Sequence, residues 1–130
     1  MKKGETSDAQ SVANKYLEAF EKGNFKQMRS LLADRGKYGA AKLSADAFIE
    51  TVRKAASWKD ITVIKAIYSD SDAALLYEGT NTQTGQRMQA TEFFEIKNGQ
   101  IQNVRGSILV LAGALADVRG FAMAAMAVAI

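Results

Sequence analysis

The chain has 130 residues with no Cys and no His, and its 17 Lys and Arg against 14 Asp and Glu give a formal net charge of +3. This length suits one domain with a buried core, so we expect a single domain over residues 1–130. Without Cys and His the chain has no disulfide, no thiolate zinc site and no Ser-His or Cys-His catalysis, and we expect neither a metal nor a cofactor.

Three amphipathic helices are predicted in the first half of the chain. Residues 6–8 offer three possible caps for the first helix, whose apolar stripe includes Tyr16. Asn24 is placed to cap a second helix. After a loop over residues 33–43, Ser44 is placed to cap a third. These helices need an apolar surface to cover.

Four segments rich in β-branched and aromatic residues follow, and turn sequences such as Asn98-Gly99 separate them. They are residues 60–68, 73–82, 87–96 and 100–110. We expect an antiparallel meander with its more apolar face toward the helices, which makes an α+β domain. That face is predicted to carry Leu75, Tyr77, Met88, Ala90, Glu92, Phe94, Ile96, Ile101, Asn103 and Arg105.

The hairpin turn sets the predicted register of this face. If Asn98 and Gly99 form a two-residue turn, Glu92 lies directly opposite Arg105. Pairing across the preceding turn places Tyr77 opposite Glu92 as well. Beside Arg105 the pKa of the Glu92 carboxyl should be depressed, whereas an apolar cavity that shields it from Arg105 should raise that pKa. We expect the ionised form, because the arginine is directly opposite.

Two segments carry a resemblance to a known family. The opening "ANKYLEAFEKGNFKQMRSLLAD" and the hairpin "EFFEIKNGQIQNVRG" resemble the nuclear transport factor 2-like (NTF2-like) superfamily, which includes SnoaL-like cyclases and ketosteroid isomerases. The resemblance covers most of residues 7–110. It implies a cone-shaped domain with three N-terminal helices packed on a curved antiparallel sheet, and a homodimer formed through the outer sheet face or the C-terminal tail.

The resemblance also implies site residues. Tyr16 matches the first-helix tyrosine that donates to a developing oxyanion, and Glu92 matches an acid kept protonated for the same task, so these two are the candidate catalytic residues. The aspartate base of the isomerases has no counterpart, because the loop at 33–43 has no carboxylate after Asp34. The candidate ligand-binding residues are Tyr38, Trp58, Tyr77, Phe94, Asn103 and Arg105.

Each candidate also has a structural interpretation. Tyr16 is equally suited to the core with its hydroxyl at the rim, and Tyr38 and Trp58 to the core or a pocket wall. Glu92 and Arg105 can form a cross-strand ion pair without any ligand.

Three functions follow for the domain. The first is binding of a small, largely apolar or aromatic ligand between helices and sheet. The second is an isomerase, cyclase or dehydratase that uses Tyr16 and Glu92. The third is a non-catalytic protein-interaction module, which a cone filled with side chains would favour.

The two ends of the chain bear on its location. An apolar extension begins at about residue 111, and Asp117 and Arg119 divide it into pieces shorter than the roughly 20 residues of a membrane-spanning helix. After about Gly113 we expect a helix that packs on its own domain or on a partner. The N-terminus has no apolar segment of a secretory signal, and the basic residues are scattered rather than clustered. We therefore expect a cytoplasmic protein that binds neither membrane nor nucleic acid.

Overall fold

The computed structural model describes residues 8–111 and 125–129. Its first elements are α1 (Asp8–Lys22), α2 (Phe25–Ser30), β1 (Leu32–Tyr38) and α3 (Ala45–Ala55). The remaining strands are β2 (Trp58–Tyr68), β3 (Asp72–Asn81), β4 (Arg87–Lys97), β5 (Gln100–Leu111) and β6 (Ala125–Ala129). The predicted α+β class, with three N-terminal helices on a mostly antiparallel sheet, is confirmed.

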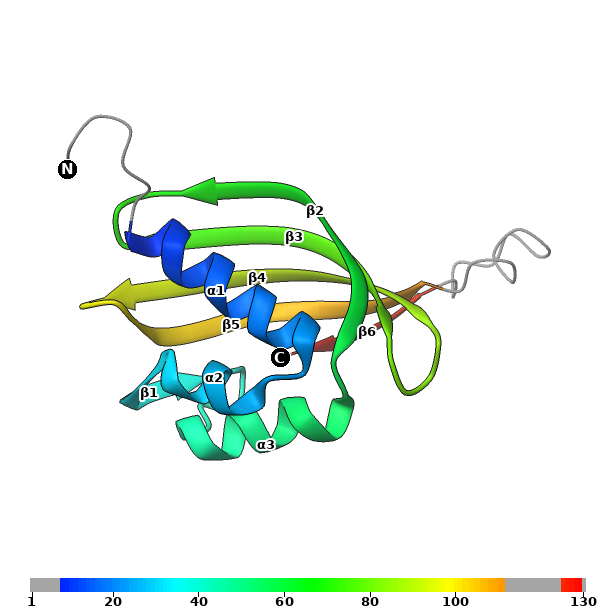
Figure 1. Cartoon of the computed structure of the whole chain (residues 1–130), viewed down its shortest axis with the longest axis horizontal. Helices are drawn as coiled ribbons and strands as arrows, with labels where there is room; N and C mark the ends of the chain where they lie inside the picture. The colour runs from blue at the N-terminus through cyan, green and yellow to red at the C-terminus, as the bar shows by residue number, and fades with distance from the viewer. Residues whose placement is uncertain (1–7, 112–124, 130) are drawn as a thin grey trace.

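The strands form one sheet in the order β1-β5-β4-β3-β2, with β6 also paired to β5. Figure 1 shows α1 lying across one face of this sheet, with α2 and α3 beside it on the side of β1. The core lies between these helices and the sheet, and includes Phe48, Phe94 and Val104, each 1% exposed or less. In the described ranges, no helix is both long and apolar enough to cross a membrane.

Local sequence signals set the ends of the elements as predicted. Asn24 and Ser44 accept hydrogen bonds from the backbone N–H groups three residues later, which caps α2 and α3. Asn98 and Gly99 both have positive φ, 54° and 74°, and close a two-residue turn in which Lys97 pairs with Gln100.

The segment at residues 33–43 was expected to be a loop, and that expectation is wrong for most of it. Residues 32–38 form β1, a short strand that pairs in parallel with β5. Tyr38 holds the strand in place, because its hydroxyl lies 2.8 Å from the carbonyl oxygen of Ala33 and 2.6 Å from that of Ile101. Gly36 is required beside it, since a Cβ there would lie 2.1 Å from the Tyr38 hydroxyl.

The predicted register of the last hairpin is also wrong beyond its first two pairs. Ile96 pairs with Ile101 but Glu95 pairs with Asn103, so Gln102 is an extra residue in β5 and makes a β-bulge. Because side chains alternate along a strand, the bulge moves every later residue of β5 to the opposite face. Asn103 and Arg105 therefore leave the helix-covered face, which Val104, Gly106 and Ile108 take instead.

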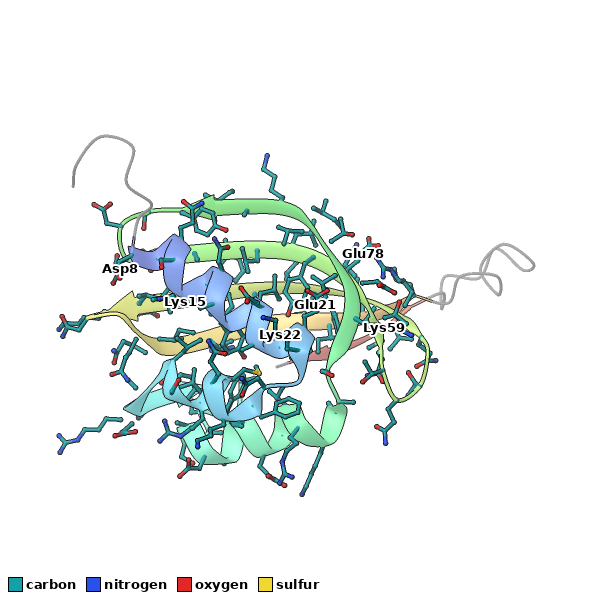
Figure 2. The ribbon with its side chains drawn as sticks, viewed as in Figure 1. Asp8, Lys15, Glu21, Lys22, Lys59 and Glu78 are labelled. Carbon is teal, nitrogen blue, oxygen red and sulfur yellow. The ribbon has the colours of Figure 1, made fainter. Side chains whose placement is uncertain are left out.

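The side chain of Glu21 connects α1 to β2, the edge strand of the sheet that lies farthest from β1. Glu21 reaches β2 and accepts a hydrogen bond of 2.9 Å from the backbone N–H of Ile61 (Figure 2). This contact follows Asp60, whose positive φ of 52° interrupts the pairing of β2 with β3. Lys15 and Lys22 lie on the exposed side of the helix (Figure 2). The opposite side of α1 is therefore held over the sheet.

A helix was expected after about Gly113, and this expectation is wrong for residues 125–129, the part of the tail that the structure describes. Residues 125–129 form β6, which pairs antiparallel with residues 107–111 of β5. β1 pairs only with the first part of β5, so β6 supplies hydrogen-bond partners to the rest of that edge. Residues 112–124 lie outside the described part of the chain.

Candidate functional site: a buried carboxyl group in an apolar cavity

A cavity of about 340 Å³ lies between the helices and the covered face of the sheet. The helices contribute Tyr16 and Phe20 from α1, and Phe48, Thr51, Val52 and Ala55 from α3. The sheet contributes Trp58, Tyr77, Glu92 and Ile108. The loop that follows β1 contributes Gly39, Ala40, Ala41 and Leu43. The exposed residues of this lining are Ala40, Ala41, Thr51 and Ala55, and all of them belong to this loop or to α3.

Most of this lining is apolar, and Thr51 contributes a hydroxyl group that is partly used within its own helix. The hydroxyl of Thr51 donates a hydrogen bond of 3.0 Å to the carbonyl oxygen of Ala47 inside α3. That bond uses the proton of the hydroxyl within the helix, so Thr51 can only accept a hydrogen bond from the cavity. The ionisable lining residues are Tyr16, Tyr77 and Glu92.

Glu92 and Tyr77 form the polar centre of the site. Glu92 pairs with Leu75 on β3 and Tyr77 with Ala90 on β4, so the two side chains lie diagonally on the same face of the sheet. The predicted pairing of Tyr77 with Glu92 is wrong by two residues, because the turn between β3 and β4 is longer than two residues. The hydroxyl of Tyr77 donates a hydrogen bond to Oε1 of Glu92. Glu92 is only 3% exposed, and this tyrosine is its one hydrogen-bond partner among the described side chains.

Two polar atoms of the site remain open to the cavity. Oε2 of Glu92 and the hydroxyl of Tyr16 make no hydrogen bond with the described residues. In the described residues, every side-chain oxygen or nitrogen that is fully buried has a hydrogen-bond partner. These two atoms have none, so they are not fully buried. Both atoms are therefore accessible from the cavity that their residues line.

On β5, the residue opposite Glu92 is Gly106, which contributes no side chain. A Cβ at this position would lie 2.0 Å from the carbonyl oxygen of Thr91. The close approach of the two backbones therefore depends on glycine.

The surroundings of Glu92 raise its pKa from 4.5 to about 7, because burial disfavours the charged form more than the hydrogen bond from Tyr77 favours it. Burial also raises the pKa of Tyr16 and of Tyr77 well above 10, and the nearby charge of Glu92 adds to both shifts. At neutral pH both phenols are therefore protonated, while Glu92 is close to its midpoint.

Aromatic contacts fix the two tyrosines. The ring of Tyr16 meets Phe94 edge to face at a centroid distance of 5.2 Å. Trp58 lies between Tyr77, at 5.5 Å, and Phe20, at 5.7 Å. The hydroxyl groups at the cavity are thus held by packed rings.

Of the residues expected to bind a ligand, Tyr77 and Trp58 line the cavity. Phe94 does not line it but packs against the ring of Tyr16. Tyr38 does not line it, because its hydroxyl is used within the backbone of β1 and β5. Asn103 also lies elsewhere and donates to Glu95 on the other face of the sheet.

The expected pair of Glu92 with Arg105 does not form. Arg105 pairs with Phe93 and is exposed on the outer face, because the bulge at Gln102 turns it away from the helices. The expectation of an ionised Glu92 with a depressed pKa is wrong for the same reason.

Several lining residues were not among the candidates. Phe20 is one helical turn after Tyr16, so the apolar stripe of α1 was a usable signal for it. No comparable signal marks residues 39–41 or Ile108, since their place at the cavity depends on β1 and on the bulge in β5.

Comparison with other proteins connects this geometry to a known fold. No family model and no curated protein sequence matches the chain. Among solved structures, a candidate ketosteroid isomerase from Kribbella flavida DSM 17836 is similar with a TM-score of 0.64 and 17% identity, over 76% of each chain. A candidate polyketide cyclase from Xanthomonas campestris pv. campestris has a TM-score of 0.56 and 22% identity, over 76% of this chain and 88% of that one.

An LEH-like epoxide hydrolase from M. tuberculosis has a TM-score of 0.65 and 15% identity, over 88% of this chain and 97% of that one. An NTF2-like protein of unknown function from Cytophaga hutchinsonii has the same TM-score, 14% identity, and covers 79% and 91% of the two chains. These likenesses confirm that the chain has the NTF2-like fold.

Proposed function

We propose that this domain binds one small, largely apolar molecule that carries a carbonyl or hydroxyl oxygen. The observation that carries the proposal is a 340 Å³ apolar cavity in which Glu92, Tyr77 and Tyr16 supply the ionisable groups. Such a volume is at the lower end of the range for small-molecule pockets, whose lining is typically apolar with a few oriented polar groups. A cone filled with side chains would have favoured a protein-interaction module instead.

The burial of Glu92 supports the same proposal. A buried carboxyl group is costly unless its atoms find partners, and Glu92 has one partner for two oxygens within the described residues. A ligand oxygen near Oε2 and the Tyr16 hydroxyl would satisfy both atoms that face the cavity.

Catalysis of the isomerase, cyclase or dehydratase type is a second candidate. It is favoured by the pKa of about 7 for Glu92, since a general acid or base works best when its pKa is close to the working pH. The lining described here contains no second carboxylate to divide proton transfer between two groups. We therefore place binding first.

The proposal is tested by intrinsic fluorescence, because the single tryptophan of the chain, Trp58, lines the cavity. Saturated bicyclic probes such as 1-decalone and 1-decalol have no strong absorption near the indole band, since the alcohol is transparent there and the ketone has only a weak carbonyl band, so a change in emission reports occupancy. We expect saturable binding that weakens in Tyr16→Phe and is retained in Tyr68→Phe, whose hydroxyl is outside the cavity. Absence of binding by both probes, checked by calorimetry, would contradict the proposal.

We also propose that the domain forms a homodimer through the outer face of the sheet. Ile67, Ala74, Phe93 and Arg105 form one row across four strands of that face. Ile67 and Phe93 are each 61% exposed, and Ala74 lies between them, so this face carries a contiguous apolar row. Sedimentation should give twice the chain mass for the wild type and for Lys15→Glu, and the chain mass for Phe93→Glu. A wild type that sediments as a monomer at all concentrations would refute the dimer.

A further inference from the structure

We infer that the proton on Glu92 selects the kind of ligand: the neutral acid accepts a molecule with a carbonyl, and the carboxylate accepts one with a hydroxyl. This inference rests on the proposed binding function and specifies its regulation. It follows from the way in which Tyr77 orients the carboxyl group toward the cavity.

Tyr77 determines which carboxyl oxygen carries the proton. Its hydroxyl donates to Oε1 of Glu92 and has no other hydrogen-bond partner among the described residues, so we infer that Oε1 remains the acceptor when Glu92 is neutral as well as when it is ionised. In the neutral acid the proton therefore belongs on Oε2, the oxygen that is accessible from the cavity. Oε2 then donates a hydrogen bond when Glu92 is neutral and only accepts when Glu92 is ionised.

The groups around Glu92 do not hold it in one state. α1 presents Tyr16 and β3 presents Tyr77, both protonated at neutral pH because burial raises their pKa. β5 presents Gly106 opposite Glu92, and its Arg105 is on the other face of the sheet. The linings from α3, from β2 and from the loop after β1 contain no charged residue.

Burial then raises the pKa of Glu92 to about 7, so both states are populated near neutral pH. A neighbouring lysine or arginine would have kept the carboxylate charged throughout this range.

The hydroxyl of Tyr16 fits both kinds of ligand. It can donate to a carbonyl oxygen beside the neutral acid, and it can donate to the oxygen of a ligand hydroxyl whose proton goes to Oε2. Selection therefore depends on Glu92 and not on Tyr16. A ligand without a donor leaves Oε2 of the carboxylate unpaired. A ligand hydroxyl can accept from the neutral acid, but Oε2 no longer accepts the proton of that hydroxyl, so one donor at the site is left without an acceptor.

The expected effect follows from linkage between protonation and binding. If a ketone binds only the neutral acid, its affinity falls about tenfold between about pH 6 and pH 8 for a group with a pKa of about 7. If the alcohol binds only the carboxylate, its affinity rises about tenfold over the same interval, and the preference between the two ligands changes about a hundredfold.

The test measures dissociation constants of 1-decalone and 1-decalol across this pH range, using Trp58 emission and calorimetry. In the wild type, and equally in Glu95→Gln, the affinity for 1-decalone should fall and the affinity for 1-decalol should rise as the pH increases. Glu95 is the matched control, because it is on the same strand but faces away from the helices. Glu92→Gln keeps an acceptor for Tyr77 and places an amide donor toward the cavity, so it should bind the ketone at every pH with no trend.

The outcomes separate this inference from the function on which it rests. Binding of both probes with parallel or flat pH trends would overturn the inference and leave the binding function standing. Opposite trends that persist in Glu92→Gln would also overturn it, since another group would then be responsible. Absence of binding by both probes at every pH would overturn the binding function and the inference together.

Discussion

The hydroxyl of Tyr77 donates a hydrogen bond to Glu92 across two neighbouring strands, although the two residues are not directly opposite in the sheet. Leu75 is opposite Glu92, and Tyr77 is two residues further along the same face. A long side chain can span such a diagonal pair, whereas a short one cannot. The ring contact with Trp58 holds Tyr77 in the orientation that makes this possible.

Removal of this hydrogen bond should raise the pKa of Glu92 further. In Tyr77→Phe the burial that raises the pKa remains, while the hydrogen bond that lowers it is lost. Carbon-13 NMR of the Glu92 carboxyl group should therefore report a midpoint above that of the wild type. Tyr68→Phe serves as the control and should leave the midpoint unchanged. An unchanged or lower midpoint in Tyr77→Phe would show that the tyrosine does not stabilise the carboxylate.

The raised pKa of Glu92 should make the folded state less stable as the pH rises. Between about pH 4.5 and pH 7 the folded state keeps a proton on Glu92 that the unfolded chain has released. The free energy of unfolding therefore loses about 3 kcal/mol across this window, and the loss is complete above it.

Glu92→Gln has no proton to release and should lack this loss. The difference in unfolding free energy between Glu92→Gln and the wild type, from urea denaturation, should shift in favour of the variant as the pH rises through the window. Glu95→Gln on the outer face should follow the wild type. Curves for the wild type and Glu92→Gln that stay parallel from pH 4.5 to 8 would rule out a buried, raised carboxyl group.

Ala56 should be replaceable by glycine with a gain in stability. It follows α3 at the cavity wall with φ 74° and ψ 157°, a backbone conformation that is almost restricted to glycine. Ala56→Gly should relieve strain of about 1 kcal/mol and raise the melting temperature. Ala55→Gly, one residue earlier in the last turn of the helix, should lower stability by about 0.5 to 1 kcal/mol. Equal losses in both variants would argue against strain at Ala56.

Deletion of the tail after Leu111 should change the behaviour of the protein in solution. Without β6 the edge of β5 at residues 107–111 loses its backbone partners and is free to pair with another chain. We expect lower solubility or a larger sedimenting mass. A truncated protein that remains soluble with an unchanged mass would show that β6 is dispensable for both.

Much of this domain could be predicted because local chemistry specifies it. The Asn24 and Ser44 caps, the stripe of Tyr16 on α1 and the Asn98-Gly99 turn each depend on residues within a few positions of one another. Backbone hydrogen bonds and side-chain periodicity act over the same short distance. The α+β class followed from these signals. So did the position of Tyr16 on the sheet-facing side of α1 and the position of Glu92 on the helix-covered face of the sheet.

The charge state of the site depended on tertiary structure alone. One extra residue, Gln102, turns Arg105 to the outer face and places Gly106 opposite Glu92. No residue type in that segment marks the bulge, which becomes visible only in the pairing of β5 with β4. A side chain moves to the other face of a sheet when the register shifts by one residue. The sequence determined which groups are present at the site, and only the packing of the strands decided that Glu92 is buried beside a tyrosine instead of an arginine.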